Sequence, residues 1–393
     1  MTNTNDLPEW SDYLALMSKA DTLLAQLPDS DDPQQRQELY RLMFAAITTG
    51  YHSAFNPPGS PDFVPAVSNV LNTIGVNPDF IYGYTPLDGS GSYRISGVRG
   101  CEVFILMDLS GGGFGVLDEF GPSLGTIDFD TLHFDENGYF ELLLSAEKPG
   151  NYSGDWHYLD PKTKTVNIRK AYYDWGEGQE ARIAIERLDD KPVQTRLSAD
   201  DIANRLRLLS GYIERYVGFI LGYGKRQREQ GLINKLEHDD WAGQGGVSGQ
   251  HYYQGLFELQ PGEVLLLETE LPESVRYWNI QVNDILWNTI DWFNHQSSIN
   301  GHQAVLDSDG KFRAVIAVDD PGIPNWLDTG GHNQGSLMLR WSGASSGPEP
   351  RLTIVSAADI RSHLPMDTPQ VSTEQRQNQL RERHRNAQWR RRW

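Results

Sequence analysis

Two segments of sixteen residues in the sequence are similar to each other and align without a gap. The copies are residues 135–150 and 307–322, in which Asp, Gly, Phe, Pro and Gly coincide. A tryptophan follows each copy, at Trp156 and Trp326, and an Ile-Arg or Leu-Arg pair comes about one strand later. This shared order of turn, strand, Pro-Gly loop, tryptophan and strand predicts two similar β units from an internal duplication. Chance is the alternative, because β-hairpins reuse Asp-Gly turns.

The rest of the chain sorts into helical and strand-rich regions around these two units. With 393 residues, 38% of them hydrophobic and 11% aromatic, the chain can bury a sizeable core and form several domains. Many short strands with Gly-rich turns are typical of antiparallel sandwiches, and the helices lie apart from them, which predicts an α+β fold. We expect a helical N-terminal region at 1–75, β unit one at 76–190, a helical linker region at 191–250, β unit two at 251–360 and a basic C-terminal tail at 361–393.

Periodicity and capping signals place the individual elements. Apolar residues at helical spacing predict helices within 10–27, over 34–49 and over 197–230, and a short helix near 63–74. Apolar runs of strand length predict strands at 92–98, 102–109, 140–144, 165–172 and 181–188. Ser372 with Gln375 forms a capping box, so a further helix is expected to begin there.

The charge of the chain is uneven. The net charge is −19, so the acidic body repels phosphate backbones and nucleic-acid binding by the body is not expected. The segment from Glu374 onward instead holds seven arginines against two glutamates. We expect this segment to form a terminal helix on the acidic surface of the protein itself. An arm for nucleic acid or an anionic membrane is the alternative.

Several classes of protein are disfavoured by missing features. No run of 18 apolar residues predicts a membrane span, and the first residues lack the pattern of a secretory signal, so we expect a cytoplasmic protein. The single cysteine, Cys101, excludes a disulfide framework and cysteine-rich metal sites. No nucleotide-binding or α/β-hydrolase motif is present, and no cofactor is predicted. The sequence is compatible with a homo-oligomer.

Two loops of unit two concentrate residues that are suited to chemistry. The repeat places both loops at one strand pair, so His295, His302, Asp328 and His332 are expected to converge at one rim. A histidine oriented by a carboxylate is an acid–base pair near neutral pH. Purely structural hydrogen bonding is the first alternative and a three-histidine metal site the second, but no strong metal signature is present and no metal is predicted.

Further residues complete the expected pocket. Asn300 and Asn325 would position a substrate oxygen, and Trp287, Trp292 and Trp326 would form the apolar wall that such pockets need. Strand alternation turns Asn279 and Gln281 to one face, as the polar wall of a pocket or as a hydrogen-bonded face.

Four segments resemble a known family. They are Asn77-Pro-Asp, Tyr93-Arg-Ile-Ser-Gly-Val-Arg-Gly100, Asn300-Gly-His-Gln303 and Asp320-Pro-Gly-Ile-Pro-Asn-Trp-Leu-Asp328. Together they resemble the bacterial family of domain of unknown function 1214, which often pairs with the related domain 1254. The resemblance extends over about residues 77–369. It implies a multidomain protein with β-sandwich-like units and helical insertions, and it implies no settled chemistry.

The leading hypothesis is an enzyme that acts on a small, largely apolar molecule, alicyclic or aromatic. His302 or His332 would act as general acid or base with Asp328 orienting an imidazole, and hydrolysis, hydration or isomerisation would suit this set. A non-catalytic binding module, for instance for carbohydrate, is the second hypothesis, and solvent-facing aromatic rings would favour it. An assembly protein is the third, and a large exposed apolar patch would favour that.

Overall fold

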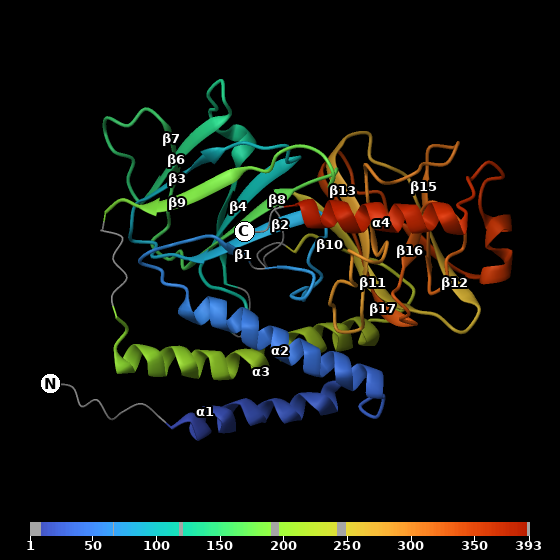
Figure 1. Ribbon diagram of the computed structural model, residues 1–393, viewed down its shortest axis with the longest axis horizontal. Coiled ribbons are helices and arrows are strands. Elements are labelled where there is room, and N and C mark those ends of the chain that lie inside the picture. The colour runs from blue at the N-terminus through green and yellow to red at the C-terminus, as the bar shows by residue number, and fades with distance from the viewer. Residues whose placement is uncertain (1–8, 66, 118–120, 190–195, 242–248, 391–393) are drawn as a thin grey trace.

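The computed structural model describes residues 9–65, 67–117, 121–189, 196–241 and 249–390. Two strand-rich units lie side by side, and helices α1, α2 and α3 form a layer below them in the view of Figure 1. Each unit consists of two sheets. The expected α+β fold, with N-terminal helices and a helical insertion between two similar β units, is confirmed. None of the described helices has the length and apolar character needed to cross a membrane.

Unit one pairs a five-stranded sheet with a four-stranded sheet. The larger sheet has the order β1-β2-β8-β4-β5 and the smaller has the order β7-β6-β3-β9. The strands are β1 (Val64–Pro65), β2 (Phe80–Pro86), β3 (Tyr93–Val98), β4 (Phe104–Ser110), β5 (Ser123–Asp128), β6 (Tyr139–Ser145), β7 (Asp155–Tyr158), β8 (Thr165–Ala171) and β9 (Arg182–Arg187).

Unit two repeats this arrangement. Its larger sheet has the order β10-β11-β17-β13-β14 and its smaller sheet the order β16-β15-β12-β18. The strands are β10 (Glu237–Asp239), β11 (Gln250–Glu258), β12 (Glu263–Thr269), β13 (Val275–Asn283), β14 (Ser298–Asn300), β15 (Phe312–Ala317), β16 (Trp326–Asp328), β17 (Gln334–Ala344) and β18 (Arg351–Ser356). Each strand from β2 to β9 therefore has a counterpart from β11 to β18 at the same place in its sheet.

The repeated block explains part of this correspondence. Gly138 and Gly310 close the two turns with φ of 75° and 79°, a left-handed conformation that glycine adopts without a steric penalty. Each turn leads into a strand that pairs in parallel with a short strand containing a tryptophan. Trp156 pairs with Leu143, and Trp326 pairs in the same way with Val315. The two units thus share local geometry as well as topology, and a duplication as its origin stays a prediction.

Alternation along the strands builds one core in each unit. In unit one, residues such as Ile105, Met107 and Ile168 turn inward between the two sheets and are buried. Unit two has an equivalent core that includes Trp278, Ile280 and other residues between its two sheets. The intervening residues of the two larger sheets point to their outer faces, where the helices and the other unit are packed.

The helical layer covers these outer faces. It consists of α1 (Trp10–Met17), the 3-10 helix η1 (Ser18–Gln26), α2 (Pro33–Phe55) and α3 (Ala199–Glu229). Ser198 accepts a hydrogen bond from the backbone N–H of Asp201 and starts α3 with a capping box. The apolar faces of these helices pack together and against Leu286, Trp287 and Met338 of unit two.

The C-terminal helix α4 (Thr373–Trp389) crosses unit two and ends beside unit one (Figure 1). It begins at the expected capping box of Ser372 and Gln375. Arg376 forms an ion pair with Asp320 at 2.9 Å, and Arg390 donates a hydrogen bond to the carbonyl of Pro78 at 2.6 Å. Arginines of the basic tail therefore join the two units. Two shorter 3-10 helices, η2 (Phe129–Thr131) and η3 (Ala357–His363), complete the fold.

The strands expected at 92–98, 102–109, 140–144, 165–172 and 181–188 correspond to β3, β4, β6, β8 and β9. The short helix expected near 63–74 is wrong: this segment contains β1 and turns, apart from residue 66, which lies outside the described residues. Its apolar residues instead line a cavity beside β2. Strand β2 itself was not predicted, because its sequence Phe-Ile-Tyr-Gly-Tyr-Thr-Pro lacks a clean alternation of apolar and polar residues.

Candidate functional site

Two of the four residues expected at the rim of unit two do meet. His295 and Asp328 are joined by a hydrogen bond of 2.7 Å between Nδ1 and Oδ2. This hydrogen bond raises the pKa of His295, while partial burial of the ring opposes the shift. Asp328 also accepts the backbone N–H of Gly330 at 2.8 Å, which fixes the carboxylate.

Among the described residues, neither of the other two histidines has a side-chain hydrogen bond or an ion pair with this pair. His302 is exposed and faces Asp174 of unit one, with Nε2 at 3.7 Å from Oδ2. His332 is half-buried and donates its backbone N–H to the carbonyl of Thr329. Within the described ranges, no group of three or more His, Cys, Asp or Glu side chains could hold a metal ion. The geometry thus brings one imidazole to Asp328 rather than three to a common rim.

The expected substrate-binding amides are buried and hydrogen-bonded to the protein. Asn300 donates to Asp79 at 2.8 Å, and Asn325 donates to the carbonyls of Val305 and Arg313 at 2.6 and 2.8 Å. Asn300 therefore joins the two units, and Asn325 holds a loop of unit two.

The amides of β13 lie in a second buried network. Gln281 donates to the carbonyls of Gly75 and Val76 at 3.2 and 3.1 Å, and it accepts a hydrogen bond from Arg340. Asn279 also accepts from Arg340, at 3.3 Å. Strand alternation allowed either a pocket wall or a hydrogen-bonded face for Asn279 and Gln281. In the structure these two side chains form a hydrogen-bonded face.

The three expected tryptophans are buried in three different places. Trp292 packs with Trp175 and Phe293 beside α4. Trp326 lies under Arg376, whose guanidinium carbon is 5.2 Å from the ring centre. Trp287 alone of the three lines a large cavity.

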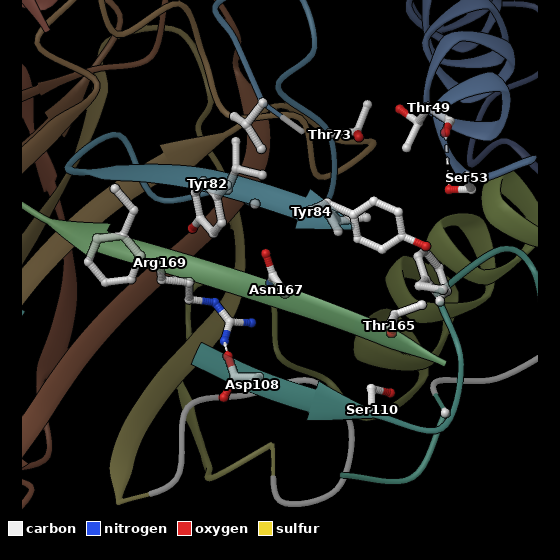
Figure 2. Close-up of a pocket in the computed structure, with 18 of the residues that line it drawn as sticks. Thr49, Ser53, Thr73, Tyr82, Tyr84, Asp108, Ser110, Thr165, Asn167 and Arg169 are labelled. Carbon is white, nitrogen blue, oxygen red and sulfur yellow. Dashed lines mark hydrogen bonds and ion pairs between the residues drawn. The ribbon is translucent and has the colours of Figure 1, made fainter. Parts of the chain in front are cut away.

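This cavity has a volume of about 300 Å³ and lies between the helical layer and the outer faces of the two larger sheets. Figure 2 shows its part over β2, β8 and β4. The residues that matter most for its chemistry are His52, Ser53, Thr73, Phe80, Tyr82, Tyr84, Asp108, Ser110, Phe114, Asn167, Arg169, Tyr212, Tyr216, Trp241, Gln250, Tyr252, Trp287, Met338 and Arg340. Aromatic rings dominate this set, and a few polar groups lie among them, as in many small-molecule sites.

The floor of the cavity follows from strand register. Tyr84, Asn167 and Asp108 lie side by side on β2, β8 and β4, and Tyr82 lies beside Arg169 in the next row. All five side chains are on the face opposite the unit-one core, because residues two apart share a face. Arg169 and Asp108 form an ion pair on this floor (Figure 2).

Helices α2 and α3 close the cavity above β2. Ser53 lies on α2 near Tyr84, and its hydroxyl donates to the carbonyl of Thr49 at 3.1 Å (Figure 2). Burial raises the pKa of Tyr84 to about 12, so the phenol is neutral at physiological pH. Tyr212 on α3 donates to the carbonyl of Phe114 at 3.0 Å and thereby holds the loop after β4 at the edge of the cavity.

Unit two contributes the opposite wall. The ring of Trp287 stacks on Tyr223, with centres 4.7 Å apart, and packs against Gly75. Gly75 has a φ of 58°, and a Cβ there would lie 2.4 Å from the indole nitrogen, so only glycine suits this position. Its carbonyl in turn accepts a hydrogen bond from Arg340 at 2.7 Å.

The sequence did not point to the unit-one floor or to Gln250. Thr165, Asn167 and Arg169 alternate with apolar residues along β8, which is the signal of an outer polar face. The repeat carried a second signal, since Arg169 and Arg340 follow their blocks at matching places. Gln250 was assigned to the end of the linker region, whereas it begins β11.

The chain is similar to one family model and to solved structures of other proteins. Residues 262–346 match the family model described as "Protein of unknown function (DUF1214)". A crystal structure of an uncharacterised protein from Burkholderia cenocepacia is similar, with a TM-score of 0.83 and 25% sequence identity over 89% of this chain and 97% of that one. The VPA0106 protein from Vibrio parahaemolyticus matches with a TM-score of 0.46 and 13% identity over 80% of this chain and 98% of that one. No curated protein matches the chain.

The family match confirms the resemblance recognised in the sequence. It covers most of unit two, which is a shorter segment than residues 77–369. A relation to the domain 1254 family stays a prediction.

Proposed function

The chain carries a DUF1214 domain in unit two, and from this premise we propose that it binds a small, predominantly apolar organic molecule in the cavity between its helices and its two β units. The observation that supports the proposal is the cavity itself, with its volume of about 300 Å³. Pockets of this size and larger are typical of small-molecule sites. Transfer of an apolar molecule from water to such surroundings is favourable by about 25 cal/mol per Å² of apolar surface buried.

The aromatic lining supports an alicyclic or aromatic ligand. Trp287 and Trp241 lie nearly parallel, with ring centres 5.6 Å apart, and Tyr82 and Tyr252 present further rings to the same space. Offset stacking and edge contacts with such rings add to the effect of burial alone. The alternative of a carbohydrate-binding module relied on solvent-facing rings. Trp287, Trp292 and Trp326 are all buried, so these residues do not support it.

Catalysis is a more specific hypothesis, and two groups of residues support it. Of the described histidines, His52 alone lines the cavity, where the neighbouring hydroxyls of Ser53 and Thr49 accompany it. The second place is the pair of His295 and Asp328, which has the geometry of an oriented acid–base group outside the cavity. A general acid or base at His295 would require a substrate bound at the rim of unit two.

A variant that fills the cavity tests the binding proposal. Asn167 lies at the middle of the floor, and its replacement by phenylalanine adds a ring to the space (Figure 2). Asn151→Phe in an exposed turn is the matched control. The probe is N-phenyl-1-naphthylamine, a neutral molecule whose fluorescence increases in apolar surroundings.

We expect one molecule of probe to bind per chain in the unmodified protein and in Asn151→Phe. Binding should be at least tenfold weaker in Asn167→Phe. Equal affinity in all three proteins, or no binding to the unmodified protein, would contradict the proposal.

A further inference from the structure

A buried arginine in the cavity wall has no ion pair with any acidic residue that the structure describes. Arg340 is 5% exposed, and its hydrogen bonds within the described residues go to the carbonyl of Gly75 and the side-chain oxygens of Asn279 and Gln281. All three acceptors are neutral. A guanidinium has five N–H groups, so these three hydrogen bonds leave two N–H groups for another acceptor. A buried charge without a counter-charge is costly unless a ligand supplies one.

The corresponding arginine of unit one has the carboxylate neighbour that Arg340 does not have in the described part of the chain. Arg169 and Arg340 occupy the same position in their sheets, because each is the direct partner of a tyrosine, Tyr82 or Tyr252, on the preceding strand of the order. By the same register, Asp108 of β4 corresponds to Gln281 of β13.

Each of these two residues contacts its arginine. Asp108 neutralises Arg169 as an ion pair, whereas Gln281 offers Arg340 only an amide oxygen, at 2.5 Å. The cavity therefore contains one neutralised and one uncompensated guanidinium.

A second polar group beside Arg340 has no hydrogen-bond partner in the part of the chain that the structure describes. Gln250 also lines the cavity and is 2% exposed, and neither its side-chain nitrogen nor its side-chain oxygen has a hydrogen-bond partner among the described residues. It lies on β11 two residues before Tyr252, which pairs directly with Arg340. Such diagonal neighbours on one sheet face are about 7–8 Å apart, so one ligand group can contact both side chains. Buried amides without a hydrogen-bond partner are uncommon in folded proteins, and a bound ligand can supply that partner.

We propose that the ligand is a small apolar carboxylic acid whose carboxylate binds Arg340 and the amide nitrogen of Gln250, while its apolar body lies among the rings of Tyr82, Tyr252 and Trp287. This assignment rests on the proposed binding function of the cavity and adds the charged group of the ligand. A planar carboxylate matches the fork of a guanidinium and forms strong charge-assisted hydrogen bonds with it.

Matched pairs of probes test the charge directly on the unmodified protein. Benzoate, cyclohexanecarboxylate, 2-naphthoate and octanoate are each compared with their primary amides by isothermal titration calorimetry at pH 7.5. The members of a pair have nearly the same shape and differ in charge. We expect at least one carboxylate to bind more than tenfold tighter than its amide.

Two kinds of variant then assign the preference to Arg340. Arg340→Gln should reduce the ratio of carboxylate to amide affinity to about one, whereas Arg351→Gln, an exposed position on β18, should keep it. Asn279→Asp supplies an internal carboxylate beside Arg340 and should abolish the preference with the arginine in place. Asn279→Ala loses the same hydrogen bond to Asn77 without adding charge and should retain the preference.

Each outcome decides between the two proposals. Equal binding of carboxylate and amide, or a preference that survives both Arg340→Gln and Asn279→Asp, would overturn the carboxylate assignment. Binding of N-phenyl-1-naphthylamine without binding of any carboxylate would overturn it as well and leave the cavity function intact. Failure of every probe, including that neutral one, would overturn the binding function itself. If Arg340→Gln does not fold, the pair of Asn279 variants decides.

Discussion

The two larger sheets have the same strand order, but the polar residues on their outer faces have different surroundings. On unit one, Asn167 and the ion pair of Arg169 and Asp108 face the cavity. On unit two, Asn279 and Gln281 are buried in a network that reaches Gly75 and Val76 and includes Arg340. One copy of the architecture thus has an open polar face and an internal counter-ion, and the other has a closed amide network around an uncompensated charge.

This difference shows how a repeated scaffold can build one asymmetric site. The backbone positions of Arg169 and Arg340 are equivalent by register, so topology alone does not distinguish them. What differs is the diagonal neighbour that contacts each arginine from the next strand, Asp108 or Gln281. Because a carboxylate neutralises a guanidinium and an amide does not, we infer that unit one provides shape and unit two provides the anchoring charge.

The largest expected effect comes from the buried network of unit two. Gln281→Leu removes an acceptor of the buried Arg340 and a donor to the carbonyls of Gly75 and Val76, so we expect the free energy of unfolding to fall by about 3 kcal/mol. The matched change on unit one, Asn167→Leu, should alter stability by less than about 0.5 kcal/mol, because that side chain faces the cavity. Urea unfolding of both variants measures this, and equal losses would show that the two faces do not differ as described.

A moderate effect is expected from the ion pair of unit one. Asp108→Asn gives Arg169 the same neutral neighbour that Arg340 has, and it should lower stability by about 1–2 kcal/mol because the pair is largely buried. Thermal unfolding of Asp108→Asn measures this loss. An unchanged melting temperature would show that the ion pair does not stabilise unit one.

The smallest effect concerns His295, at the rim away from the cavity. Asp328 raises the pKa of this imidazole, so its nuclear magnetic resonance titration should lie above the ordinary value of about 6.5. Because the folded-state pKa is raised, the pair stabilises the protein fully below about pH 6.5, and this contribution is lost as pH rises through the folded-state pKa.

Partial exposure of the His295 ring to solvent limits this stabilisation to less than about 1 kcal/mol. Asp328→Asn should move the pKa back toward 6.5 and leave probe binding in the cavity unchanged. If the affinity of the cavity for the probe changed with the protonation of His295, the cavity and the pair of His295 and Asp328 would not be independent sites, which would contradict this account.

The sequence predicted the architecture better than the site, for physical reasons. Strands such as β6 and β8 were found because alternation and the repeat are local signals, and the same signals gave the contact of His295 with Asp328. The cavity depends on three distant segments, and Asn167, Gln250 and Trp287 meet only after the units and helices pack. Asn300 was expected to position a substrate oxygen, and alternation left Asn279 open between a pocket wall and a hydrogen-bonded face. Both amides hydrogen-bond to other parts of the chain.

A crystal structure of the protein with 2-naphthoate would test the central claim most directly. The account predicts electron density for one molecule in the cavity, with its carboxylate within hydrogen-bonding distance of Arg340 and Gln250 and its rings between Tyr82, Tyr252 and Trp287. A cavity that stays without ligand at saturating concentration, or a carboxylate that turns away from Arg340 toward solvent, would contradict it.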